Sequence, residues 1–144
     1  MLIGRFERPV GAAGDIELPS CFAAVLSAGA VAARGIEPCI RVYPIAEWEQ
    51  YSADLMRRLP YLSRPARQLL RHQFSGAEPV QIVDRRMPLP ERLRAYARIA
   101  DHVAILGLDR VIEIWDLEHW QRIDDDVIAR AEAIADSLTD ARTA

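Results

Sequence analysis

Two pairs of arginines have the chemistry to bind a nucleic acid. Arg85 and Arg86 are adjacent in the middle of the chain, and Arg5 and Arg8 lie near its start. A guanidinium group is a planar fork of N–H donors that matches the oxygens of a phosphate and the O6 and N7 edge of guanine. We therefore take Arg86, Arg85, Arg5 and Arg8 as candidate DNA-binding residues. The alternative is that they are solvated surface residues.

The charge of the chain is unevenly distributed. The 144 residues have a net charge of −3, which argues against attraction of the whole molecule to nucleic acid. All 18 basic residues are arginines, and ten of them lie between Arg57 and Arg98 with only three acidic residues. This segregation can steer a polyanion to one face of the protein, although the same arginines would also suit solvated helix faces.

No other arrangement of side chains points clearly to a function. The three histidines are far apart and have no metal-binding spacing, and Cys21 and Cys39 form neither a CxxC pair nor a zinc pattern. The run Asp124 to Asp126 suits the N-terminus of a helix better than a cation, because consecutive helical residues point in different directions. The apolar run from Cys21 to Ala33 is too short to cross a bilayer. We expect no enzymatic activity, no cofactor, no metal, no small-molecule substrate and no membrane partner, and a cytoplasmic location.

The elements that must position the arginines follow a pattern that occurs twice, 71 to 72 residues apart. Each copy has a Leu-Pro dipeptide, a strand-like stretch that alternates polar and apolar residues, and then a helix with a tryptophan. The residues that mark the copies are Leu18-Pro19, Tyr43 and Trp48 in the first and Leu89-Pro90, Trp115 and Trp120 in the second. The duplication predicts two lobes that bury their apolar faces against each other, with the tryptophans in the core or in subunit contacts.

Two helices are expected between the copies. Apolar residues at helical spacing over 46–59 predict an amphipathic helix. Ser63 is a candidate N-cap of the next helix, whose outward face carries Arg64, Arg67 and Arg71. This stripe of arginines suits acidic residues of a neighbouring subunit as well as it suits DNA.

Two further expectations concern the second copy. Gly107-Leu108-Asp109 predicts a hairpin turn between strands 102–106 and 111–115. The carboxylates of Asp124 to Asp126 predict that the last helix begins there, with an apolar face that includes Ile128 and Leu138. The predicted division of the chain is 1–60 for the first repeat, 61–78 for a linking helix, 79–122 for the second repeat and 123–144 for a C-terminal helix and tail.

The order and spacing of several short motifs resemble the MraZ family of bacterial transcription regulators, within the AbrB-like swapped-hairpin superfamily. The motifs are Val42-Tyr43-Pro44, Glu47-Trp48-Glu49, Ala66-Arg67-Gln68-Leu69-Leu70, Phe74-Ser75-Gly76-Ala77, Leu93-Arg94-Ala95-Tyr96-Ala97 and Ile112-Glu113-Ile114-Trp115 with Trp120. The resemblance implies an α+β fold in which two pseudo-repeats form a swapped-hairpin AbrB-type β-barrel with flanking helices. It also implies a ring-like homo-oligomer that binds repeated operators upstream of cell-division and cell-wall genes.

The family's functional motif is degenerate in the first repeat. Each family repeat usually carries an Asp-x-x-Gly-Arg turn ahead of the strand that ends in proline. Counted back from Pro19, Gly11 stands at the Asp position, Gly14 at the Gly and Asp15 at the Arg. An expected cation is therefore an anion, which reverses the sign of a phosphate contact.

The second turn appears in a shortened form. Asp84 can stand for the motif aspartate and Arg86 for its arginine, whereas the glycine is missing. A turn that needs positive φ normally takes glycine, so Arg85 in that place predicts a different turn geometry.

The resemblance implies a sequence-specific DNA-binding transcriptional regulator, with repression the expected effect. Its partners would be double-stranded DNA and further copies of the chain, and it would be associated with the nucleoid. The alternative is a scaffold or protein-interaction protein that keeps the fold and has lost DNA binding, because both motif turns are altered.

Overall fold

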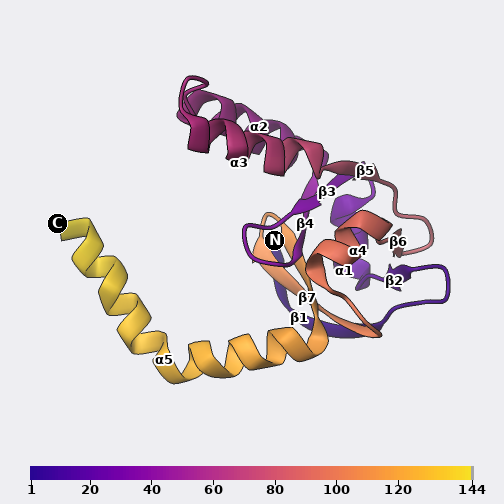
Figure 1. Ribbon diagram of the computed structural model, residues 1–144. Coiled ribbons are helices and arrows are strands. Elements are labelled where there is room, and N and C mark those ends of the chain that lie inside the picture. Colours follow the sequence, from indigo (N-terminus) through magenta and orange to yellow (C-terminus); the bar gives the residue numbers. More distant parts are fainter. Residues whose placement is uncertain (144) are drawn as a thin grey trace.

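The computed structural model describes the backbone of residues 1–143 and the side chains of residues 1–139. The protein is α+β, as the sequence predicts, with one six-stranded antiparallel sheet, a separate two-stranded ribbon and flanking helices (Figure 1). The elements along the chain are β1 (Leu2–Pro9), β2 (Asp15–Glu17), α1 (Ser20–Leu26), β3 (Ala30–Arg34), β4 (Ile40–Pro44), α2 (Ile45–Arg58), α3 (Arg64–Ser75), β5 (Glu78–Val80), β6 (Arg86–Pro88), α4 (Glu91–Ala97), β7 (His102–Asp109), β8 (Ile112–Asp116) and α5 (Leu117–Thr143).

The strand order shows how the two copies of the pattern combine. The large sheet has the order β1-β7-β8-β4-β3-β5. Strand β1 of the first copy pairs with β7 of the second, and β5 of the second copy pairs with β3 of the first. The equivalent strands β4 and β8 pair in the centre. Exchanging each strand for its equivalent in the other copy (β1 for β5, β3 for β7 and β4 for β8) gives the same order read from the other edge of the sheet. The two copies are therefore interleaved about a pseudo-twofold axis.

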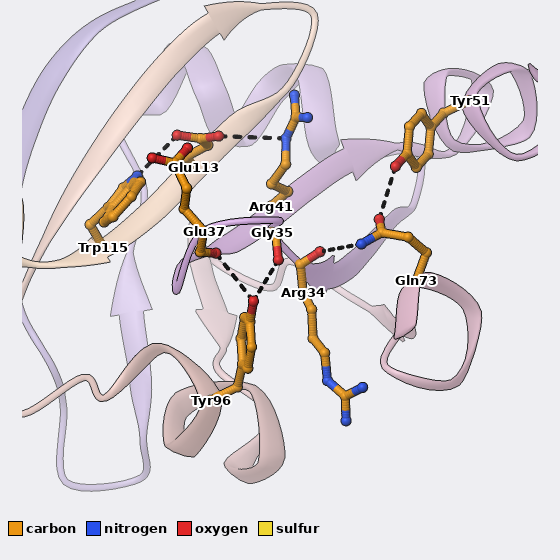
Figure 2. A network of polar contacts seen from close by, with 9 residues as sticks. All are labelled: Arg34, Gly35, Glu37, Arg41, Tyr51, Gln73, Tyr96, Glu113 and Trp115. Atoms are coloured by element: carbon orange, nitrogen blue, oxygen red, sulfur yellow. Dashed lines mark hydrogen bonds and ion pairs between the residues drawn. The ribbon is translucent and has the colours of Figure 1, made fainter. Parts of the chain in front are cut away.

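Equivalent residues of the two copies meet where this axis passes. In the ribbon of β2 and β6, Ile16 pairs with Met87, and both side chains are fully buried. In the centre of the sheet Arg41 pairs with Glu113, and Arg41 Nε lies 3.7 Å from Glu113 Oε2 (Figure 2). The second pair joins opposite charges, although its members occupy the same position in the two copies.

The tryptophans pack in aromatic clusters, as predicted, with Trp115 buried and Trp48 and Trp120 half-buried. Tyr43 is buried against Trp48, with ring centroids 5.3 Å apart, and the equivalent Trp115 is buried against Trp120 at 5.6 Å. Each aromatic cluster also contains a residue from the other copy, because Val111 joins the first cluster and Cys39 the second.

Partly buried polar contacts attach the helices to the end of β3 and to the loop that follows it (Figure 2). Gln73 of α3 is 1% exposed, and its amide donates to the carbonyl of Arg34 at 3.2 Å. The hydroxyl of Tyr51 donates to the Gln73 amide oxygen at 2.9 Å, which links α2 to α3. From α4, the hydroxyl of Tyr96 donates to the carbonyl of Gly35 at 2.6 Å. The buried amide of Gln73 is thus satisfied by two partners, one on β3 and one on α2.

The last helix begins earlier than the sequence predicts. Helix α5 starts at Leu117, so the prediction that it starts at Asp124 to Asp126 is wrong. The cap is Asp116, whose carboxylate accepts the N–H of His119 at 3.3 Å, three residues into the helix. The aspartates predicted to form the cap therefore lie inside the helix.

The hairpin of the second copy also turns later than predicted. Gly107 lies within β7, opposite Gly4 of β1, and Asp109 has a positive φ of 69° at the end of the strand. A Cβ on Gly107 would lie 2.5 Å from the backbone carbon of Leu2, so glycine is required by the close approach of two strands rather than by a turn. Strand β3 was not predicted, because its residues Ala30–Arg34 continue an apolar run without alternation.

Candidate nucleic-acid interface

The two turns expected to contact DNA lead into the paired strands β2 and β6, from opposite ends of this short ribbon. The first turn covers residues 11–14 and leads into β2, and the second covers residues 83–86 and leads into β6. In Figure 1 both loops project from the side of the body that lies away from α5 and from the α2–α3 hairpin. The antiparallel pairing of β2 with β6 therefore brings together the two motif positions that are far apart in sequence.

Glycine gives the first turn its geometry. The N–H of Gly11 donates to the carbonyl of Asp15 at 2.7 Å, and the N–H of Gly14 donates to the carbonyl of Gly11 at 2.9 Å. Gly14 has a φ of 75°, and a Cβ there would lie 2.9 Å from Cζ of Arg94. The positive φ is what favours glycine here, and the guanidinium group of Arg94 packs on its open face.

The second turn closes with one residue fewer. Val83 and Arg86 exchange two backbone hydrogen bonds, of 3.0 and 2.9 Å. Asp84 and Arg85 form the loop between them with positive φ values of 51° and 62°, which are typical of a type I′ hairpin turn. The turn geometry does differ from that of the first turn, as predicted, but the reason given for it is wrong: Arg85 adopts the left-handed backbone despite its side chain, at a cost of about 1–2 kcal/mol.

Matching hydrogen bonds identify the residue that replaces the missing glycine. The N–H of Leu18 donates to the carbonyl of Arg85 at 2.8 Å, and the N–H of Leu89 donates to the carbonyl of Gly14 at 2.9 Å. Leu18 and Leu89 are the leucines of the two Leu-Pro dipeptides. Arg85 is therefore the structural counterpart of Gly14.

Asp84 does not take the place of the motif aspartate. The N–H of Gly11 bonds to the carbonyl of the first residue of β2, and the N–H of Val83 bonds to that of the first residue of β6. Val83 is therefore the counterpart of Gly11, and Asp84 lies inside the loop.

Both arginines of the second turn form ion pairs with β2. Arg86 Nε donates to Asp15 Oδ2 at 2.6 Å, and Arg85 donates to Glu17 Oε1 at 2.8 Å. The hydrogen bond from Arg86 holds the pKa of Asp15 below its usual value, and the same bond raises the pKa of Arg86. The side chains of Arg85 and Arg86 keep 54% and 43% of their surface exposed. The pair Asp15–Arg86 joins equivalent positions of the two copies, 71 residues apart.

Arg5 and Arg8 lie on β1, on opposite faces of the strand. Arg5 pairs with Glu7 at 2.8 Å and with Asp124 of α5 at 3.2 Å. Arg8 lies over the ring of Phe6, 5.8 Å from its centroid, and donates to the backbone carbonyl of Glu7. The structure thus brings Arg85 and Arg86 together but directs Arg5 toward α5.

The arginine stripe of α3 is on the hairpin, away from the ribbon. Arg67 donates to the carbonyl of Tyr61 at 2.8 Å and lies over its ring. Arg64 and Arg71 are exposed and have no carboxylate partner among the side chains that the structure describes.

Sequence reasoning did not anticipate that Asp15 and Glu17 would be the partners of the candidate arginines. The signal was present: Asp15 and Arg86 occupy the same place in the duplicated pattern, and equivalent positions meet at the axis of an interleaved pair. Glu17 lies opposite Arg86 in the strand register.

The remaining reactive side chains are dispersed. Cys21 is exposed on α1, while Cys39 is buried, and its burial raises the pKa of the thiol. Within the described part of the chain, no three histidine, cysteine, aspartate or glutamate side chains gather in a way that could hold a metal ion. None of the described helices is both long and apolar enough to cross a membrane.

Comparison with known proteins identifies relatives along the whole chain. Residues 74–141, the second repeat and most of α5, match the family model described as "MraZ protein, putative antitoxin-like". The chain is 34% identical to the transcriptional regulator MraZ of Herpetosiphon aurantiacus over 96% of its own length and 97% of the relative. It is 34% identical to that of Roseiflexus castenholzii over 99% of both chains, and 31% identical to that of Acetivibrio thermocellus over 96% of both.

Proposed function

The chain belongs to the MraZ family, and on that basis we propose that it is a sequence-specific DNA-binding repressor of cell-division and cell-wall genes. The relatives named above are called transcriptional regulators, and none of these names denotes an enzyme. The proposed partner is double-stranded DNA, and the proposed location is the cytoplasm, at the nucleoid.

The observation that carries the proposal is the placement of both motif turns on one exposed ribbon. A two-stranded antiparallel ribbon fits the major groove of B-DNA, where arginine reads guanine with both arms of its guanidinium group. Arg85 and Arg86 lie where the second turn enters β6, at one end of this ribbon, and their side chains are about half exposed. We assign them base or phosphate contacts, and we assign Arg8 and Arg5 supporting phosphate contacts.

The same proposal includes a ring-like homo-oligomer. The apolar face predicted for the last helix is not covered by the rest of the chain, since Ile128 and Leu138 are 68% and 63% exposed. The tip of the α2–α3 hairpin likewise exposes Met56 and Leu62. Uncovered apolar surface of this kind is typical of subunit contacts. Several copies on one DNA would multiply weak single contacts.

A second function is favoured by the ion pairs of the ribbon. Because Arg85 and Arg86 already have carboxylate partners, the protein can keep its fold and assembly while binding DNA weakly or not at all. It would then act as a scaffold or protein-interaction protein.

A gel-shift experiment separates the two functions. Labelled duplex from the region upstream of the protein's own gene is titrated with the purified oligomer at two salt concentrations. We expect binding that weakens steeply with salt and weakens further in Arg86→Ala. Arg130→Ala is the matched control, because Arg130 is an exposed arginine that pairs with Asp126 on α5. An intact oligomer that shifts no duplex at low salt would leave only the scaffold function.

A further inference from the structure

Each carboxylate of β2 occupies one donor nitrogen of an arginine that a DNA phosphate would use. Arg86 Nε is 2.6 Å from Asp15, and Arg85 is 2.8 Å from Glu17. These distances are those of charge-assisted hydrogen bonds, in which a carboxylate oxygen and a phosphate oxygen are interchangeable acceptors. A phosphate can still reach the other N–H donors of each guanidinium group, but it meets a cation whose charge the carboxylate already neutralises.

We propose that Asp15 and Glu17 are negative determinants of DNA affinity, which mask the two arginines of the second turn in the free protein. The proposal rests on the DNA-binding function proposed above and deepens it. Asp15 occupies the position in the first copy that Arg86 occupies in the second, so the residue equivalent to the arginine neutralises it instead of adding a second positive charge.

Two physical effects act in the same direction. First, an exposed ion pair must be broken before the arginine can bind, and such pairs are weak but not negligible. Second, the carboxylate stays close to the DNA and repels its phosphates within the screening length of about 8–10 Å. Removal of one carboxylate should therefore raise the affinity for duplex DNA about two- to fivefold at a single site.

The variants that test this are Asp15→Asn and Glu17→Gln, which keep the size of the side chain and remove its charge. Asp126→Asn is the matched control: Asp126 forms an exposed ion pair with Arg130 at 2.7 Å, and its pKa is lowered by that bond, as the pKa of Asp15 is by Arg86. Asp126 is part of α5, and this helix extends from the body on the side away from the ribbon (Figure 1). All three variants change the net charge by the same amount.

The first measurement is the affinity for the labelled upstream duplex as a function of salt. We expect tighter binding by Asp15→Asn and Glu17→Gln, little change in Asp126→Asn, and a salt dependence steeper by roughly 0.9 in log K against log salt for each arginine released. The gain should vanish in the double variant Asp15→Asn with Arg86→Ala. The proposal is overturned if Asp126→Asn gains as much as Asp15→Asn, or if the gain survives without Arg86.

The second measurement does not depend on DNA. On immobilised heparin, Asp15→Asn should elute at higher salt than Asp126→Asn, because the released Arg86 can bind any polyanion. If wild-type protein binds the duplex as tightly as Asp15→Asn does, the masking is overturned and the DNA-binding function stands. If wild-type protein shifts no duplex but Asp15→Asn elutes later than Asp126→Asn from heparin, the masking is supported and the proposed DNA-binding function is overturned. Equal elution of the two variants overturns the masking whatever the duplex shows.

Discussion

Because the backbone at Arg85 is left-handed, we expect glycine to be more stabilising than alanine at this position, the reverse of the usual order. At an ordinary position glycine destabilises a protein relative to alanine by about 0.4–1 kcal/mol, because it has more conformations to lose on folding. At Arg85, where φ is 62°, alanine keeps the cost of the left-handed region and glycine does not. That cost is about 1–2 kcal/mol for a residue with a Cβ.

The comparison of Arg85→Gly with Arg85→Ala isolates this effect. Both variants lose the ion pair between Arg85 and Glu17, two side chains that are about half exposed. The loss of this pair is therefore the same in both variants and cancels in the comparison. The difference of the two terms predicts that Arg85→Gly is more stable than Arg85→Ala by roughly 0.5–1 kcal/mol. Ala13→Gly in the first turn is the control, because Ala13 lacks a positive φ and should show the ordinary loss.

The assay is urea unfolding at one fixed protomer concentration, since assembly couples stability to concentration. The slope m should be the same for all variants, so that a shift of the midpoint reports stability alone. If Arg85→Ala is as stable as Arg85→Gly or more stable, the second turn does not have the left-handed geometry described above, and its equivalence to the first turn fails with it.

Three other substitutions test separate features. Asp15→Asn should remove the stability that the ion pair with Arg86 provides. Because the pKa of Asp15 is lowered from 3.8 in the folded protein, wild type should be more stable than the variant above about that pH, and this advantage should disappear as the pH falls below it. Thermal unfolding at a series of pH values would show the change. Gln73→Ala should lower the free energy of unfolding by about 1–3 kcal/mol for each hydrogen-bond partner left unsatisfied, which is more than the loss in Tyr51→Phe. Urea unfolding measures both losses, and equal losses would contradict the network of Figure 2. Gly107→Ala should cost about 1–3 kcal/mol and speed amide exchange in β1, since the new Cβ would meet the backbone of Leu2; unchanged exchange would contradict that close approach.

The sequence was sufficient where one physical signal dominates. The duplicated Leu-Pro and tryptophan positions predicted the aromatic clusters, because large aromatic side chains at a fixed period have few other uses. The two lobes predicted from the same duplication are wrong, since strands of both copies share one sheet and one core. Ser63 was correctly identified as an N-cap, and its side chain accepts the N–H of Ala66.

The sequence was insufficient where tertiary contacts decide. Gly107 looked like a turn residue, but it is required by the approach of β1, which local sequence does not show. Asp116, and not one of the three later aspartates, caps α5 because strand β8 ends at this residue. For the candidate site, the arginines were identified from their chemistry, whereas their pairing with Asp15 and Glu17 depends on the crossing of two distant strands.

The opposite charges at equivalent positions have a consequence for how the two halves recognise each other. In a symmetric dimer of two first halves, Asp15 would face a second Asp15 and Arg41 a second Arg41. Here Asp15 meets Arg86 and Arg41 meets Glu113, so each half carries charges that attract the other half and would repel its own duplicate. The halves of this chain are therefore matched as a heterodimer is matched, and neither could substitute for the other.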